Sequence, residues 1–563
     1  MLGVANDIGE NFGLIPGFVS KKHPPWLILL IGALACFFGY GLIWLTVSST
    51  ILPLPYWMLW IALCVAANSN AWFTTAVIVT NIKNFPLQRG IVAGILKGYA
   101  GLGAAVFTES YRVLLGNSSS RLLLFLTLGI PVLCFASMFF VKPCTPAPNE
   151  DPAERGRLDF IQVSSFALGF YVLLTAILDD NISLSAPITN TLFVVMVLLL
   201  MAPLAIPVKM TLYPTPAGEL GMLGQAVGSP GSLNDEGGTA DLTEPLLEPS
   251  GVVGSPGSLK DEEGTADITE PLLEPSGVVG SPGRLNEGHD SSDVPLLLAE
   301  GEGGVNEKRK LGEDFKFIEA VVKADFWLLF FVFFFGVGSG VTVLNNLAQI
   351  GVAQGFDDTT FLLSLFGVGN FVGRLGGGFV SERFVRETSS LCRSKTIPRT
   401  VWMTCTQIIM FATYLLFPSA INATFCTATG ILGVCYGVQF SVMISTVSEL
   451  FGLKDFGTLY NFMALGNPLG ALLFSGLLAG YVYDNEATKQ QGIHLYGTNV
   501  SCVGPNCFRL TFLVLAAVCF VGSILSIVLS LRIKPFYQNL YAGGSVGVLP
   551  NTNQQDQGAA SAS

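Results

Sequence analysis

Apolar runs of about 20 residues recur along the chain and constrain its fold more than any other feature. A bilayer-spanning helix needs about 20 consecutive apolar residues, so each run predicts one crossing. Only 12% of the residues are charged, against about 25% in soluble proteins. The sequence therefore predicts an all-α polytopic membrane protein in contact with the lipid bilayer. The expected spans cover roughly residues 2–20, 26–47, 54–80, 90–111, 121–141, 160–178, 187–207, 325–349, 359–381, 399–417, 422–450, 457–483 and 508–531.

Positive charges predict the orientation of these spans. Cytosolic loops of membrane proteins carry an excess of Lys and Arg, and here the excess falls in alternate loops. The first span is short and polar, and if it does not insert, the chain has twelve spans and a cytosolic N-terminus. The loops assigned to the cytosol contain Lys21, Lys22, Lys83, Arg89, Lys142, Arg155, Arg157, Lys209, Lys316, Lys323, Arg383, Arg386, Arg393, Lys395, Arg399, Lys454, Arg532 and Lys534.

The opposite loops carry features of an extracytoplasmic face. Cys502 and Cys507 lie in the loop between the last two spans, where an oxidising compartment favours a disulfide over two free thiols. N-x-S/T sequons, the acceptors for N-glycosylation, fall at or beside the same loops. The four candidate acceptors are Asn117, Asn181, Asn422 and Asn499.

The acidity of the chain belongs to one loop. The net charge is −11, but residues 219–302 alone carry −15, so the remainder is slightly basic and predicts no cationic or nucleic-acid partner. A 24-residue sequence at 228–251 recurs at 254–277, and its Pro, Gly, Ser and acid content favours disorder. Acidic-dileucine elements follow Glu244, Glu270 and Asp293. They resemble sorting signals for clathrin adaptors, although plain repeat expansion explains any single copy equally well.

A glycine-rich helix meets a charged cluster at residues 373–386, GRLGGGFVSERFVR. The glycines permit close helix contact, and Glu382 has Arg383 or Arg386, or the helix N-terminus near Gly457, as a partner. The motif resembles the signature loop of the major facilitator superfamily, with Glu382 in place of Asp. The resemblance predicts a gate, against the alternative of a solvated basic loop that sets topology. The expected gate residues are Gly373, Arg374, Gly377, Gly378, Glu382, Arg383, Arg386, Glu449 and Arg89.

The two halves of the chain echo each other. Gly17-Phe-Val-Ser-Lys-Lys matches Gly378-Phe-Val-Ser-Glu-Arg at a cytosolic helix end. Gly90 and the segment Leu102-Gly103-Ala104 have the same spacing as Gly457 and Leu469-Gly470-Ala471. Both echoes relate spans of the same orientation, which indicates a parallel repeat, as between the two halves of a major facilitator.

Residues 84–109 and 323–351 resemble the plant nodulin-like, nuclear-fusion-defective-4-like branch of that superfamily. The resemblance implies two helical bundles joined by two extra helices. It predicts an N-terminal bundle at 1–141 that lacks its first helix, extra helices at 142–207, a disordered acidic cytosolic loop at 208–322, a six-helix C-terminal bundle at 323–534 and a disordered cytosolic tail at 535–563.

Polar residues inside the spans are candidates for the substrate cavity. Lys97 lies eight residues after Arg89, about 12 Å deep at 1.5 Å per residue. A charge at that depth faces a cavity or a partner, or snorkels; in a cavity it favours an anionic substrate. The other candidates, for which interhelical hydrogen bonding is the commoner role, are Asn68, Asn70, Asn345, Asn346, Gln349 and Gln439.

These patterns predict a secondary-active or facilitative transporter of a small solute, an organic anion if Lys97 faces the cavity, with or without a coupling ion. The alternative is a non-transporting receptor-like or scaffold protein derived from a transporter. We expect no enzyme, cofactor or metal site, since no nucleophile, metal-ligand set or paired carboxylates stand out. Both the plasma membrane and a vacuolar or other endomembrane suit the sequence, and the dileucine copies favour the latter.

Overall fold

The computed structural model describes residues 2–50, 54–144, 152–181, 185–212, 312–356, 359–391, 397–419, 422–491 and 502–541. Within these ranges all regular structure is helical, and nine helices are apolar and long enough to cross a membrane. The predicted all-α, multi-pass membrane class is confirmed. The three dileucine elements and Asn499 lie outside the described residues, as do the side chains of Asn181 and Asn422.

The N-terminal helices are α1 (Leu2–Asn11), α2 (Leu14–Lys22), α3 (Pro25–Val47), α4 (Tyr56–Asn84) and α5 (Arg89–Val113). They are followed by α6 (Ser119–Leu124), which continues through a π-helical turn into α7 (Ile130–Ser137). The span expected at 2–20 is therefore wrong as a single helix. It breaks between Asn11 and Leu14, where Gly13 presses against the side chain of Asn461 from the other half.

Two further helical segments precede the acidic loop. They are α8 (Pro152–Asn181) and α9 (Ala186–Met201), the latter leading through a 3-10 turn into α10 (Ala205–Leu212). Helix α8 packs on α5 and on α14 (Thr360–Leu391), so the extra pair touches both halves. The contact is close because Gly169 leaves room for the ring of Phe371.

The C-terminal helices begin with a short one, α12 (Phe317–Val321), followed by α13 (Ala324–Ala353), α14, α15 (Thr400–Leu416) and α16 (Asn422–Leu450). Then α17 (Phe456–Ala464), α18 (Gly466–Gly470), a π-helical stretch and α19 (Gly480–Gln491) form one continuous rod. The last helix is α20 (Asn506–Leu540).

Two boundaries predicted as disordered are corrected. Helix α20 continues to Leu540 instead of ending before 535, because Tyr537 is fully buried and bonded to another helix. The loop expected to be disordered over 208–322 is ordered at both margins, with α10 reaching Leu212 and the segment from Gly312 to Val322 docked on α16.

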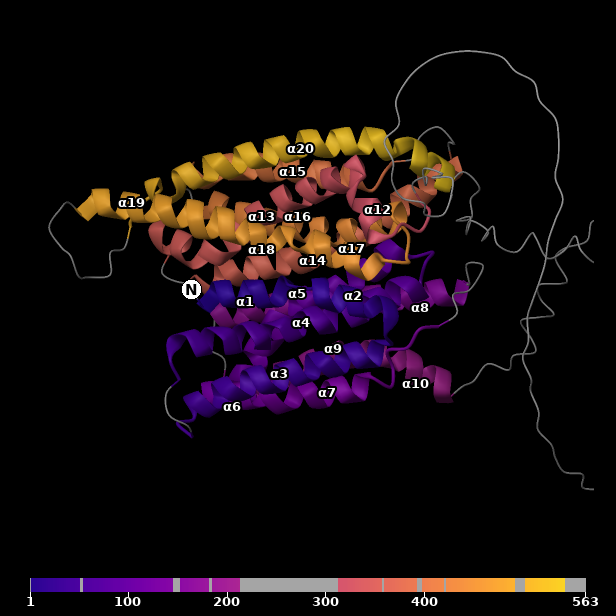
Figure 1. Ribbon diagram of the computed structural model, residues 1–563. Helices are drawn as coiled ribbons and strands as arrows, with labels where there is room; N and C mark the ends of the chain where they lie inside the picture. The colour runs from indigo at the N-terminus through magenta and orange to yellow at the C-terminus, as the bar shows by residue number, and fades with distance from the viewer. Residues whose placement is uncertain are drawn as a thin grey trace, which may run out of the picture. The chain divides into compact units, whose positions relative to one another are not determined.

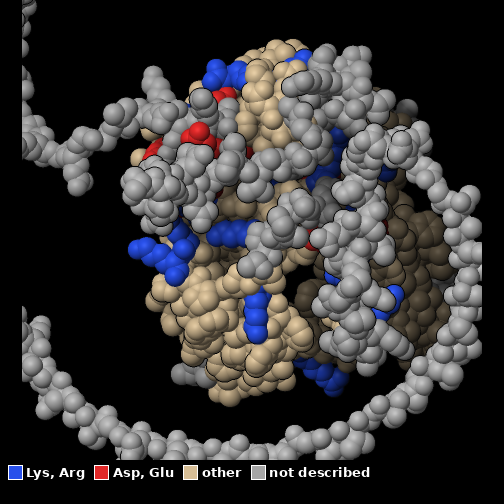
Figure 2. Space-filling view, turned by 90° about the vertical axis from the view of Figure 1, so that its right-hand side faces the viewer, with Lys and Arg blue, Asp and Glu red and all other residues tan. Residues whose placement is uncertain are grey.

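The two halves meet mainly where α5 packs on α14 and α16 and where α2 packs on α17. In Figure 1, α5 and α2 belong to the indigo and purple N-terminal helices, and their partners α14 and α17 belong to the salmon and orange C-terminal helices. The helix ends that carry the predicted cytosolic charges lie at the right of that view, around α2, α8, α10 and α12. Figure 2 shows this end, where described Lys and Arg side chains outnumber Asp and Glu.

Candidate functional site

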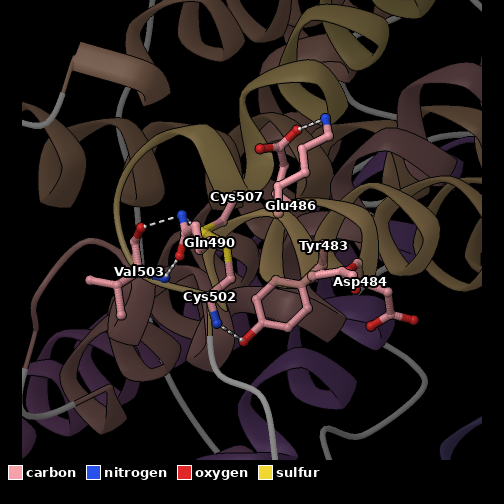
Figure 3. The surroundings of a disulfide bond; sticks show 9 residues. Tyr483, Asp484, Glu486, Gln490, Cys502, Val503 and Cys507 are labelled. Atoms are coloured by element: carbon pink, nitrogen blue, oxygen red, sulfur yellow. Dashed lines mark hydrogen bonds and ion pairs between the residues drawn. A yellow bond between two sulfur atoms is a disulfide. The ribbon is translucent and has the colours of Figure 1, made fainter. Parts of the chain in front are cut away.

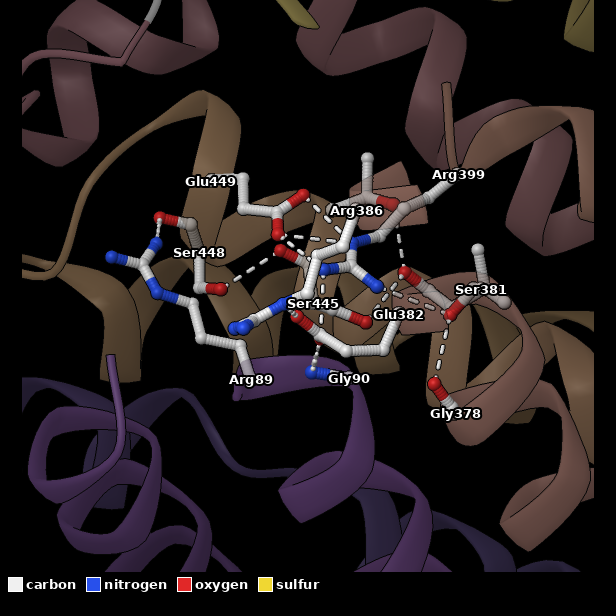
Figure 4. Close-up of polar contacts among 12 residues, drawn as sticks. Arg89, Gly90, Gly378, Ser381, Glu382, Arg386, Arg399, Ser445, Ser448 and Glu449 are labelled. Carbon is white, nitrogen blue, oxygen red and sulfur yellow. Dashed lines mark hydrogen bonds and ion pairs between the residues drawn. The ribbon is translucent and has the colours of Figure 1, made fainter. Parts of the chain in front are cut away.

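A buried arginine organises the charged cluster at this end (Figure 4). The Arg399 side chain is fully buried at the start of α15, where its Nε donates to both carboxylate oxygens of Glu449 (2.9 Å each). Its Nη2 donates to Glu449 Oε1 (2.7 Å) and to Glu382 Oε2 (2.8 Å). Arginine does not lose its proton in proteins, and two carboxylates lie within hydrogen-bond distance of this guanidinium. The guanidinium therefore stays charged, and each carboxylate depends on it.

The last helix completes the coordination of Glu449. The hydroxyl of Tyr537 donates to Oε2 (2.7 Å) and that of Tyr541 to Oε1 (3.0 Å). A buried carboxylate needs such donors because it has lost its water shell. The cluster consequently joins α15, α16 and α20.

Glu382 connects this cluster to the other half of the protein. Its Oε2 accepts a hydrogen bond from the backbone N–H of Gly90 (2.7 Å), in the first turn of α5. The first N–H groups of a helix lack partners within the helix and favour an anion. The expected docking at a helix N-terminus therefore occurs, but at α5 and not at the helix near Gly457. Of the two arginines expected as partners within α14, Arg386 pairs with Glu382, with its Nε 2.8 Å from Oε1.

Glycine makes this approach possible. A side chain at Gly378 would strike the backbone of Gly90 and Gly94, and one at Gly90 would lie 2.6 Å from Glu382 Oε2. Arg89 adds a second link, since its Nη1 donates to the carbonyl of Ser448 at the end of α16 (2.6 Å).

The repeated motif forms a matching contact between α2 and α17. Gly17, the counterpart of Gly378, packs on the backbone of Gly457 and Thr458. Lys21, which stands where the second half has Glu382, pairs with Asp455 just before α17 (2.7 Å). The two contacts are equivalent in position and use opposite charges.

Three of the expected gate residues lie elsewhere. Gly373 and Gly377 face α16 within their own bundle, where side chains would strike Val434 and Val438. Arg374 does not reach the charged cluster, because it lies two turns before Glu382 on α14. Arg383, another of the expected gate residues, does lie at the charged end, where its side chain is exposed.

Arg374 instead lies beside Lys97 near the middle of the bundle. Its Nη1 donates to the Lys97 carbonyl (3.0 Å), and its guanidinium carbon is 4.6 Å from the centre of the Phe440 ring. The Lys97 ammonium is 5.8 Å from the same ring and 5.5 Å from that of Tyr460. Among the described residues no carboxylate is within ion-pair distance of that ammonium.

Lys97 lines a small central cavity of about 40 Å³. Glu10 of α1 lines it as well and accepts a hydrogen bond from Asn70 (2.8 Å), another predicted cavity residue. The opposite wall comes from the second half, through Phe440, Tyr460 and Asn461. The cavity thus lies between the halves and holds both signs of charge.

A larger cavity of about 650 Å³ lies between α1, α13 and the α18 region. Asn345 lines it and donates to Asp7 (3.2 Å), which links α13 to α1. Asn346 is turned away from α1 and donates to Ser475 (2.9 Å). Gln349 is exposed.

Two of the predicted cavity residues form structural hydrogen bonds and line neither of these cavities. Asn68 donates to the carbonyls of Gly9 and Phe12 (3.0 Å each), which secures the break between α1 and α2. Gln439 is fully buried and donates to Met403 and Thr406 within the C-terminal bundle. In both cases the side-chain amide donates hydrogen bonds to carbonyl or hydroxyl oxygens, which lipid tails cannot do.

The opposite end carries the disulfide region (Figure 3). Cys502 and Cys507 are joined in a disulfide, and the backbone N–H of Cys502 donates to the Tyr483 hydroxyl (3.1 Å). Gln490 holds Val503 through two hydrogen bonds (2.8 and 3.0 Å). The loop is thereby fastened to α19. Asn117, a predicted glycosylation acceptor, is exposed beside α6.

Sequence reasoning missed several residues of the site. Arg399 was counted only as a loop charge, and Lys21 and Asp455 were not placed at the gate. Glu10 also went unnoticed, although an acid within the first apolar run is itself a signal of function.

Fold and site together define a polytopic helical membrane protein whose two halves meet at a charged cluster and at a small polar cavity. Residues 1–208 match the family described as Nodulin-like, and residues 313–539 match the family described as NFD4, C-terminal domain. The two family models together cover most of the chain, which belongs to the nodulin-like, NFD4-like family.

Relatives agree with this assignment. The chain is 26% identical over 549 residues to Protein NUCLEAR FUSION DEFECTIVE 4 of Arabidopsis thaliana, covering 96% of this chain and 83% of that protein. It is 28% identical over 199 residues to Probable transporter MCH1 of Yarrowia lipolytica, covering 33% and 38% of the two chains. The major facilitator transporter FucP, solved in the outward conformation, matches with 12% identity and a TM-score of 0.40 over 93% of this chain and 89% of FucP.

Proposed function

We propose that the chain is a secondary-active or facilitative transporter that moves a small organic anion by alternating access. The observation that carries the proposal is the polar central cavity between two repeated bundles, combined with a separable charged lock at one end. In alternating access, two bundles rock about a midplane site so that it opens to either face in turn.

The lock consists of contacts that can break without unfolding either bundle. Opening the charged end requires the Gly90 N–H to leave Glu382, Arg89 to leave Ser448, and Lys21 to leave Asp455. Arg399 and Glu449 lie within the C-terminal half and stay paired. Glu382 therefore keeps its partner Arg399 when the halves separate, which limits the free-energy cost of opening.

The central cavity favours an anion that also bears a hydrogen-bond donor. Lys97 offers an ammonium with no ion-pair partner among the described residues, and Arg374 adds a second positive charge behind it. Glu10 and Asn70 can accept or donate hydrogen bonds on the facing wall. A hydroxy or amino acid of few carbons has groups that complement this set.

Proteoliposome uptake tests the proposal. The full chain is reconstituted and offered a panel of radiolabelled mono-, di- and tricarboxylates and metal chelates. We expect saturable uptake of at least one carboxylate, lost in Lys97→Met and retained in Lys489→Met, a matched change at an exposed site. Uptake that survives Lys97→Met would refute the anion site. No uptake of any compound would favour the non-transporting alternative.

Three narrower proposals remain attached to this function. A coupling ion is proposed to bind at Glu10 or Asp7, the carboxylates of α1 that face the two cavities. The dileucine elements are proposed to engage a clathrin adaptor. N-glycosylation is proposed at the outer loops.

A further inference from the structure

The end of the acidic loop is docked across the gate. Residues 312–322, which we term the strap, lie alongside the turn between α16 and α17 (Figure 1). The N–H groups of Gly312 and Phe315 donate to the carbonyls of Leu450 (3.0 Å) and Phe451 (3.1 Å). The carboxylate of Asp314 accepts from the N–H groups of Leu453 (2.7 Å) and Lys454 (3.1 Å). These bonds fix the strap to the C-terminal half.

Apolar contacts extend the strap to the N-terminal half. Phe315 is fully buried and packs edge-on against Phe451 (5.9 Å between ring centres). Phe317 lies between the halves, with its ring 5.7 Å from Phe462 of α17 and 6.0 Å from Phe18 of α2. The strap therefore covers the seam between α2 and α17.

Asp455 joins the strap to the lock itself. Its Oδ2 accepts from the backbone N–H of Phe317 (3.0 Å) and from the Lys21 ammonium (2.9 Å). One carboxylate thus holds the strap, the end of α2 and the start of α17. Moving α2 away from α17 removes the Lys21 contact and the Phe18 contact together.

We propose that the strap is a built-in regulatory device that holds the α2–α17 side of the gate closed until it is released. The proposal rests on the proposed function, because a gate matters only if the chain opens. Release lowers the barrier to opening at this end and leaves the central cavity intact.

Hydrogen exchange of the full chain in lipid nanodiscs tests the strap without requiring transport. Phe317→Ala removes the ring between Phe18 and Phe462, so we expect exchange at 456–460 and 17–22 to rise about tenfold, as local opening becomes easier. The matched control is Ile318→Ala, since that neighbouring side chain is 77% exposed. It should leave both segments unchanged.

A second variant guards against misfolding of the first. Asp314→Ala loosens the strap from the α16–α17 turn and leaves the Phe317 ring in place, and we expect the same segments to exchange faster. If exchange rises within 312–322 but not in 456–460 or 17–22, the strap does not hold the gate and the proposal is overturned. If exchange rises there while no solute is transported, the strap stands and the transport proposal fails.

Discussion

Glu382 accepts a hydrogen bond from the backbone N–H of Gly90, a residue 292 positions earlier in the chain, at 2.7 Å. This single contact joins the motif of the second half to the first turn of a helix in the first half. Glu382 is at the same time one of two carboxylates that neutralise the buried Arg399. The residue therefore links the two halves and also binds a buried guanidinium.

Replacing Glu382 with Gln should destabilise the protein and loosen the gate. The amide can still accept from Gly90, but Arg399 is left with Glu449 alone. Because Arg399 keeps Glu449, its charge stays compensated and the larger penalty of a fully broken buried pair does not apply. The loss of a hydrogen bond to a charged partner should cost about 1.5–3 kcal/mol. Chemical unfolding in detergent measures the difference.

The matched control for this change is Glu486→Gln. Glu486 pairs with Lys489 at 2.6 Å at the opposite end, and the lysine is 60% exposed. Exposed pairs of this kind contribute only about 0.2–1 kcal/mol. Equal loss of stability in the two variants would contradict the view that Glu382 compensates a buried charge.

Gly378 and Gly376, two positions apart on α14, should respond in opposite ways to replacement by alanine. In Gly378→Ala the new methyl group strikes the backbone of α5, so the helices must separate, at a cost of about 1–3 kcal/mol for overpacking. In Gly376→Ala the methyl group meets no atom within 4 Å, and a gain in helix propensity of up to about 1 kcal/mol is expected. Thermal unfolding of the two variants in parallel tests this. If the two melting temperatures change alike, close contact at Gly378 does not support the gate.

The gate helices were predictable because their glycine spacing and the repeated motif are local patterns. The role of Arg399 was not, since a sequence displays it only as one more positive charge in a basic loop, and its burial arises from three helices that converge in space. The docking of Glu382 depends on the register between α14 and α5. Sequence echoes show that the helices correspond, but not which of them touch.

The central site shows the same division. The depth of Lys97 follows from helix geometry and its distance in sequence from Arg89, and the structure places it at a cavity. Asn68 and Gln439 also lie within the spans, and each donates to backbone acceptors on a neighbouring segment, the commoner role expected for such amides. An amide side chain in a helical bundle can line a cavity or bond to a neighbouring helix. Which of the two it does depends on the side of the helix that carries it.

A buried hydrogen bond between the halves should contribute to closure. Asn461 of α17 donates to the Thr75 hydroxyl of α4 (2.9 Å), and both residues are almost fully buried. Thr75→Val keeps the shape but removes the acceptor, and leaving a buried polar group unpaired costs about 1–3 kcal/mol. We expect a lower melting temperature and faster hydrogen exchange at the start of α17.

Thr429→Val provides the comparison for Thr75. Thr429 is equally buried, but its hydroxyl donates to Phe425 within its own helix (2.9 Å). Such a back-bond adds little to helix stability, so exchange at α17 should stay as in the wild type. If the two variants loosen α17 equally, the Thr75–Asn461 bond is not part of the closure.

Glycosylation at Asn117 would establish which end of the bundle faces the cytosol. Asn117 is exposed and has a positive φ of 56°, which asparagine tolerates better than glutamine, so replacing the acceptor itself would alter the turn. Ser119→Ala removes the sequon without touching that backbone, and it spares Ser118, whose hydroxyl caps α6. We expect the wild type to carry a glycan that a glycosidase removes, and Ser119→Ala to migrate as the deglycosylated protein does.

A glycan lost in Ser119→Ala puts the charged gate on the cytosolic side, because α5 runs from the gate to this loop. A wild type that lacks any glycan at Asn117, combined with labelling of Arg155→Cys from outside the cell, would reverse the predicted orientation.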